Sequence, residues 1–175
     1  MRSRFLLLFG GIAVVASSTP AAARQSAASL PRAGGISSVR PAPESARVND
    51  VLSRADNATA AGRMGEARRL YRGIIREQRD ASVYAGIAIW RLAANHIYDG
   101  DVTTGAQLLD DLADEAARYG DPTMQLRASF EAAVLWQQAK RQDLTQRNLE
   151  RVRCLLQSPA ISADLKATIE GRMVQ

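Results

Sequence analysis

Apolar residues recur at steps of three and four along the chain from residue 45 onward, with polar residues between them. This spacing places apolar side chains on one face of an α-helix, whereas a strand would need strict alternation. No alternating run of useful length occurs, so we predict an all-α fold. The clearest stripes are Leu70, Tyr71, Ile74 and Ile75; Leu108, Leu109, Leu112, Ala113 and Ala116; Leu149, Val152, Leu155 and Leu156; and Ile161, Leu165, Ile169 and Met173.

Glycine, proline and short polar side chains mark the ends of these helices. Gly62, Gly100 and Gly120 can adopt the left-handed conformation that closes a helix. Asp121 is a candidate N-cap acceptor, and Pro122 follows it at the first helical position, where proline is favoured. The other candidate N-caps are Asp80 or Ser82, Asp101, Asp143 and Ser162. The predicted helices span residues 47–60, 64–79, 82–98, 102–118, 122–140, 143–157 and 161–173.

The predicted helices contain an internal repeat with a period of 38–40 residues. Small side chains return at matching positions, and the turn glycine Gly62 is matched by Gly100. Two antiparallel helices pack closely only where small side chains let the backbones approach, so the repeat indicates stacked helical hairpins. The matching sets are Ala55, Ala58, Gly62, Ala67, Tyr71 and Ile74; Ala93, His96, Gly100, Gly105, Leu109 and Leu112; and Ala133, Trp136, Lys140, Thr145, Leu149 and Val152.

The segment Ala58-x-x-x-Gly62-Arg63-x-x-Glu66-Ala67-x-x-x-Tyr71-x-x-Ile74 resembles the turn and second helix of a tetratricopeptide repeat. The resemblance covers residues 47–157 in three units of 38–40 residues, whereas the family's unit is about 34 residues. Arg54 replaces a usually apolar residue, no proline closes the first two units, and the third unit is degenerate. The resemblance implies three stacked antiparallel helical hairpins, a tetratricopeptide-like solenoid within residues 45–175, plus a C-terminal capping helix. The alternative is an unrelated helical bundle.

In such a solenoid the first helix of each pair lines a concave groove that binds an extended peptide or a partner helix. The resemblance therefore implies a partner-binding surface along the predicted first, third and fifth helices. For Trp90 and Phe130 the alternative is a place in the hydrophobic core, because aromatic residues at helical spacing more commonly lie there than in a groove. The candidate groove residues are Asn49, Asp56, Ile87, Trp90, Arg127, Phe130, Val134 and Gln137.

The N-terminal residues have the pattern of an export signal. Arg2 and Arg4 precede an apolar run at residues 5–16, which is shorter than the roughly 20 residues of a membrane-spanning helix. Residues 21–23 supply small side chains for a signal peptidase, so we predict cleavage after Ala23 and a periplasmic or secreted protein. An uncleaved leader that anchors the chain in the inner membrane is the alternative. Residues 24–44, rich in Ala, Ser, Gly and Pro, are predicted to be a flexible linker.

Charge and composition exclude several classes of protein. The chain has 23 basic and 18 acidic residues, but five arginines lie in the first forty residues, where no acid occurs. The predicted domain is therefore nearly neutral, which disfavours nucleic-acid binding. One Cys and one His exclude disulfide scaffolds and Cys/His metal clusters.

Side chains with catalytic potential are few. His96 is the single histidine and occupies an interior position of the repeat, and Cys154 is predicted to be buried among apolar residues. The carboxylates at residues 110, 111, 114 and 115 lack a loop of oxygen ligands, so we expect them to be solvated rather than metal-bound. Arg68, Arg69, Arg72 and Arg76 form either an anion site or, more commonly, a solvated helix face. We therefore expect no catalytic residue, cofactor or metal.

These observations predict a non-catalytic adaptor or assembly factor of the bacterial cell envelope that binds a protein or peptide. The bacterial assignment rests on the leader and on 21 arginines against two lysines. One alternative is a structural subunit of a larger envelope complex. Another is an unrecognised hydrolase with a single catalytic carboxylate, for which Glu131 is the best candidate.

Overall fold

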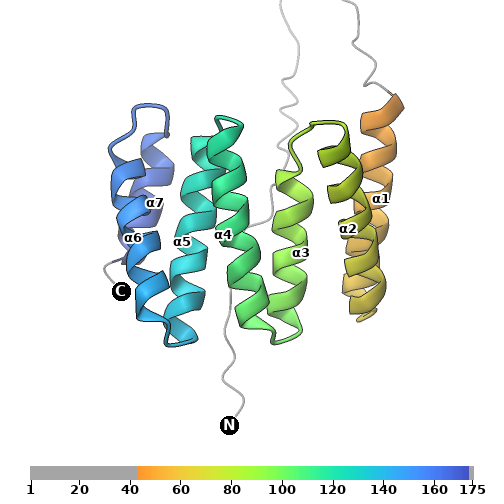
Figure 1. Ribbon diagram of the computed structural model, residues 1–175, viewed down its shortest axis with the longest axis horizontal. Helices are drawn as coiled ribbons and strands as arrows, with labels where there is room; N and C mark the ends of the chain where they lie inside the picture. Colours follow the sequence, from red (N-terminus) through yellow and green to blue (C-terminus); the bar gives the residue numbers. More distant parts are fainter. Residues whose placement is uncertain (1–42, 174–175) are drawn as a thin grey trace, which may run out of the picture. The chain divides into compact units, whose positions relative to one another are not determined.

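Residues 43–173, described by this computed structural model, form seven α-helices joined by short connections (Figure 1). The all-α prediction is confirmed, since this range contains no strand. None of its helices is long and apolar enough to span a membrane. The predicted leader and nearly all of the predicted linker lie outside the described residues. The helices are α1 (Pro43–Ala60), α2 (Met64–Asp80), α3 (Gly86–Tyr98), α4 (Val102–Arg118), α5 (Pro122–Gln138), α6 (Gln142–Leu156) and α7 (Ala163–Met173).

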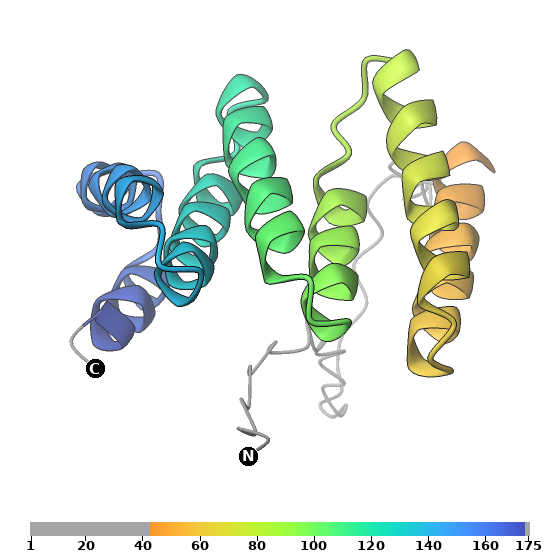
Figure 2. The same ribbon diagram turned by 60° about the horizontal axis from the view of Figure 1, so that its bottom comes forward.

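The helices α1–α6 pack mainly on their neighbours in the sequence (Figures 1 and 2). Successive helices run antiparallel, because each short connection reverses the direction of the chain. The helices α1–α6 therefore follow one another as an antiparallel series. Helix α7 packs against α5 and α6 through Leu165 and Ile169.

Most helix ends lie close to their predicted positions, and three predicted caps are confirmed. The Ser162 hydroxyl accepts a hydrogen bond from the Leu165 amide at 3.4 Å. The side chain of Asp101 accepts a hydrogen bond from the Thr104 amide at 3.2 Å, and that of Asp121 accepts one from the Met124 amide at 2.9 Å. Asp143 is not a cap, because it lies inside α6, where its carboxylate pairs with the Arg141 guanidinium. Helix α1 begins at Pro43, four residues before its predicted start.

Five consecutive turns share one hydrogen-bonding pattern at the C-terminal end of a helix. After α1, the Gly62 amide donates to the Thr59 carbonyl at 2.9 Å, and the Arg63 amide donates to the Ala58 carbonyl at 2.8 Å. This pair of bonds is the Schellman motif, which requires a left-handed residue after the helix. The left-handed residues are Gly62, Ser82, Gly100, Gly120 and Lys140, with φ between 56° and 84°.

Two of these turns lack the glycine on which the sequence prediction depended. Ser82 has a φ of 56° and belongs to the turn, so α3 begins at Gly86 rather than at residue 82. Lys140 has a φ of 58° and occupies the repeat position of Gly62 and Gly100. The turn at Lys140 therefore keeps the backbone conformation of the turns at Gly62 and Gly100 without a glycine.

We expect Lys140→Gly to raise the free energy of unfolding by about 0.5–1 kcal/mol, measured by denaturant titration. A side chain with a Cβ costs roughly 1–2 kcal/mol in the left-handed conformation, and the greater freedom of glycine in the unfolded chain offsets part of that gain. Lys140→Ala is the matched control, because it removes the charge but keeps the Cβ and should leave stability unchanged. Equal stabilisation by both substitutions would contradict the backbone explanation.

The core consists of two hydrophobic clusters. The larger spans α1–α5 and includes the small residues Ala55, Ala67 and Ala93, none of which exposes any surface. The smaller joins α5, α6 and α7. Its buried members are Leu126, Phe130, Val152, Leu156, Ile161 and Ile169. These small repeat residues are thus fully buried between the helices of the larger cluster.

Candidate functional site

A pocket of about 380 Å³ lies between α1, the first half of α2 and the second half of α3. We call it the α1–α3 pocket. Its walls combine apolar surface from three aliphatic side chains and two tyrosine rings with four polar or charged side chains, and binding sites typically combine apolar surface with polar groups in this way. The lining residues are Asp56, Thr59, Ala60, Met64, Tyr71, Arg91, Ala94, Asn95 and Tyr98.

Asp56 is the central acceptor of this pocket. Its carboxylate accepts a hydrogen bond from the Tyr71 hydroxyl at 2.6 Å and pairs with the Arg91 guanidinium. Burial, followed by the hydrogen bond to Asp56, raises the pKa of Tyr71 to about 12, so this hydroxyl stays protonated at neutral pH. The Asp56 and Arg91 side chains are 43% and 37% exposed, so a ligand can reach both charges.

A second set of hydrogen bonds fixes the α3 wall of the pocket. The buried Asn95 side chain donates to the Thr59 hydroxyl at 2.9 Å and accepts from Arg68 Nε at 2.8 Å. Arg68 also pairs with Asp99, with 2.6 Å between Nη2 and Oδ2. These bonds join α1, α2 and α3, so the polar groups of the pocket are held in place before any ligand binds.

Only one of the eight candidate groove residues, Asp56, lines this pocket. Four others are exposed elsewhere on α1, α3 and α5, and Trp90 and Val134 are half-buried against the core. The sequence analysis placed Ile87 and Trp90 on the open face of α3, but the pocket uses the adjacent face, which carries Arg91 and Asn95. The sequence signal that could have identified this face is the presence of polar residues in an otherwise apolar helix. The four exposed residues are Asn49, Ile87, Arg127 and Gln137.

Phe130 is a core residue, which favours the core interpretation of this aromatic side chain over the groove interpretation. Its side chain is 3% exposed in the smaller hydrophobic cluster. The Arg172 guanidinium of α7 lies 4.5 Å from its ring centre, a cation–π contact. Because α7 packs on this part of α5, a partner has no access to Phe130 in this arrangement.

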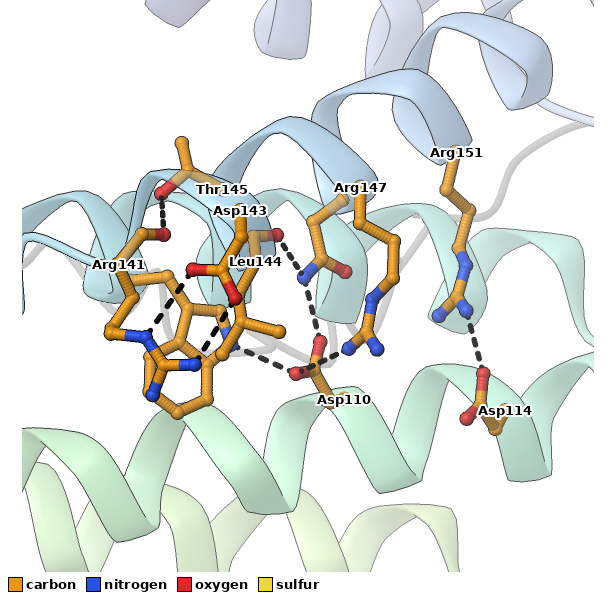
Figure 3. A network of polar contacts seen from close by, with 10 residues as sticks. Asp110, Asp114, Arg141, Asp143, Leu144, Thr145, Arg147 and Arg151 are labelled. Carbon is orange, nitrogen blue, oxygen red and sulfur yellow. Dashed lines mark hydrogen bonds and ion pairs between the residues drawn. The ribbon is translucent and has the colours of Figure 1, made fainter.

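Three of the four carboxylates of α4 pair with arginines of other helices. Asp110 is buried, and its side chain accepts hydrogen bonds from Trp136 Nε1 at 2.8 Å, Arg147 at 2.9 Å and Asn148 at 2.7 Å (Figure 3). Asp114 pairs with Arg151 at 2.7 Å. Glu115 pairs with Arg79 at 2.6 Å. Within residues 43–173, no group of three or more His, Cys, Asp or Glu side chains is arranged to hold a metal ion.

The other chemically notable side chains also have structural partners or lie on the surface. His96 is buried as predicted, and its Nδ1 lies 3.0 Å from Asp101 Oδ2. The prediction for Cys154 is wrong, because its side chain is exposed on the outer face of α6. Glu131 accepts hydrogen bonds from Arg172 with both oxygens, at 2.5 and 3.3 Å, so its carboxylate links α5 to α7.

Comparison of the chain with protein-family models, curated proteins and solved structures finds no match.

Proposed function

We propose that the protein is a non-catalytic module that binds a segment of a partner protein or peptide in the α1–α3 pocket. The observation that carries this proposal is the accessible Asp56–Arg91 pair beside the aliphatic surface of Ala60, Met64 and Ala94. A peptide offers backbone donors and acceptors to the charged pair and an apolar side chain to that surface. The wall fixed by Asn95 reduces the ordering cost of binding.

The serial packing of antiparallel helices supports a tetratricopeptide-like stack of three hairpins with α7 as a cap. Such stacks present elongated surfaces on which successive helices contribute side chains to one ligand. Together with the export signal predicted at residues 1–23, this favours an adaptor or assembly factor in the periplasm of a bacterial cell envelope. Its partner is a protein or peptide rather than a nucleic acid.

Site-specific photo-crosslinking tests this proposal in the envelope of the producing cell. A photoreactive residue replaces Tyr98, which is 62% exposed and lines the pocket. We expect a discrete crosslinked product whose yield falls when Arg91→Ala removes the guanidinium that faces Asp56. The matched control is the same photoreactive residue at Arg153, which is exposed on α6 and far from the pocket in the series of helices.

A crosslinked product of equal yield from both positions would contradict specific binding in the pocket. Absence of any product at position 98 would also contradict the proposal. Hydrolysis of cell-wall material by the purified protein would instead support the single-carboxylate hydrolase.

A further inference from the structure

A second pocket, of about 500 Å³, lies between α2, α3 and α4. We call it the arginine pocket. Its aliphatic part is formed by Ile75, Ile89, Leu92 and Leu108, of which the first three are buried. Its rim contains four arginines of α2 and one carboxylate, Asp111 of α4. The four arginines are Arg69, Arg72, Arg76 and Arg79.

The arginines form a regular row along one side of α2. Their spacing of three or four residues aligns them over about 15 Å of helix. Arg79 pairs with Glu115, which connects the end of this row to α4. Among the described residues, Arg69, Arg72 and Arg76 have no ion-pair partner. Three exposed cations therefore adjoin an aliphatic surface.

The acidic residues of α2 do not neutralise this row. Glu66 pairs with Arg63, and Glu77 pairs with Arg47 of α1. The third acid, Asp80, is the last residue of α2, and among the described residues no ion pair joins it to the row. Like charges three and four residues apart destabilise a helix, so the row costs stability in the free protein. An anionic ligand would remove that repulsion.

We propose that the arginine pocket binds an acidic peptide segment that carries apolar anchor side chains. Planar guanidinium groups pair bidentately with carboxylates, and several successive carboxylates match the row. The aliphatic part of the pocket accepts the anchors. A nucleic acid fits poorly, because no aromatic side chain lines the pocket for base stacking. A fatty acid carries one charge and would leave most of the row unpaired.

This site is separate from the α1–α3 pocket. On α3, the arginine pocket uses Ile89 and Leu92, whereas the α1–α3 pocket uses Arg91, Ala94, Asn95 and Tyr98. At the helical repeat of 3.6 residues per turn, the two sets lie roughly 140° apart around the helix axis. Ligand binding in the arginine pocket is therefore independent of partner binding in the α1–α3 pocket.

The test measures fluorescence anisotropy of a short labelled peptide that repeats Glu-Glu-Leu-Phe, titrated with the purified full chain. We expect saturable binding that weakens about tenfold for each arginine removed in Arg72→Ala and in Arg72→Ala/Arg76→Ala. Arg153→Ala is the matched control for the loss of one exposed arginine and should bind like the natural chain. All of these variants should keep their helical circular dichroism, because the replaced side chains are exposed.

Two further peptides separate the two parts of the pocket, and vesicles test a different ligand class. Replacing Glu with Gln, or replacing Leu and Phe with Ser, should abolish measurable binding in each case. No saturable binding of the first peptide, or equal binding by the double variant, would overturn the proposal. Phosphatidylglycerol vesicles that bind through Arg72 and Arg76 while the peptide does not would also overturn it, and would assign the pocket to lipid.

Discussion

Replacing Asp110 with alanine is expected to lower the free energy of unfolding by about 3–5 kcal/mol. The carboxylate is buried and accepts hydrogen bonds from α5 and α6 at once, through Trp136, Arg147 and Asn148. Its removal leaves the indole N–H of Trp136 and an amide donor of Asn148 without that acceptor, and buried donors without partners are costly. Urea unfolding monitored by Trp fluorescence and by circular dichroism measures the loss.

The adjacent residue provides the control for this prediction. The Asp111 side chain is exposed on one side, and its pKa is raised by the desolvation that neighbouring residues cause and by the nearby charges of Asp110 and Asp114. Because these charges repel its carboxylate, Asp111→Ala should leave stability unchanged or slightly higher. Similar losses at both positions would show that Asp110 does not join α4 to α5 and α6 as described.

Phe130→Ala is expected to destabilise the protein by about 3–5 kcal/mol, the cost of removing a buried aromatic side chain from a core. Phe130 lies at the junction of α5, α6 and α7, so the cavity would affect the packing of all three helices. It would also remove the ring beneath Arg172. Thermal and urea unfolding measure the effect, and proteolysis should cut earliest near α7.

Gln137 belongs to the same helix but is exposed, so Gln137→Ala should change stability by less than about 0.5 kcal/mol. This comparison separates the two roles considered for Phe130. A groove residue would lose partner binding on substitution and keep its stability, whereas a core residue loses stability first. Unchanged unfolding of Phe130→Ala would therefore contradict the core assignment.

The helices were predictable because their sequence signals are local. Apolar stripes such as the one containing Leu109 and Leu112 identify a buried face, and Gly100 with Asp101 marks both the end of one helix and the cap of the next. Local signals do not predict the turns at Ser82 and Lys140, because packing of the flanking helices imposes a left-handed conformation that these residue types rarely adopt. Tertiary structure determines those two turns.

The candidate site was harder to predict, because its contacts join residues far apart in the sequence. Asp56 was identified, but its partners Tyr71 and Arg91 come from two other helices. The predicted groove face of α3 and the face that lines the pocket differ by a rotation of one residue position about the helix axis. In a helix with few polar residues, the spacing of apolar side chains does not distinguish two faces that lie so close together. Asp110 and Asn148 are 38 positions apart, and neither residue type by itself indicates a buried pair.

The order of the helices also bears on how the chain reaches its folded state. Since α1–α6 rest mainly on the helix before or after them, each can form its contacts as soon as that neighbour exists. Chains dominated by such short-range contacts fold rapidly, and in serial stacks the ends open at lower cost than the middle. The segment around α4 and α5, enclosed on both sides, is then the last to exchange its amide hydrogens with water, and α1 is among the first.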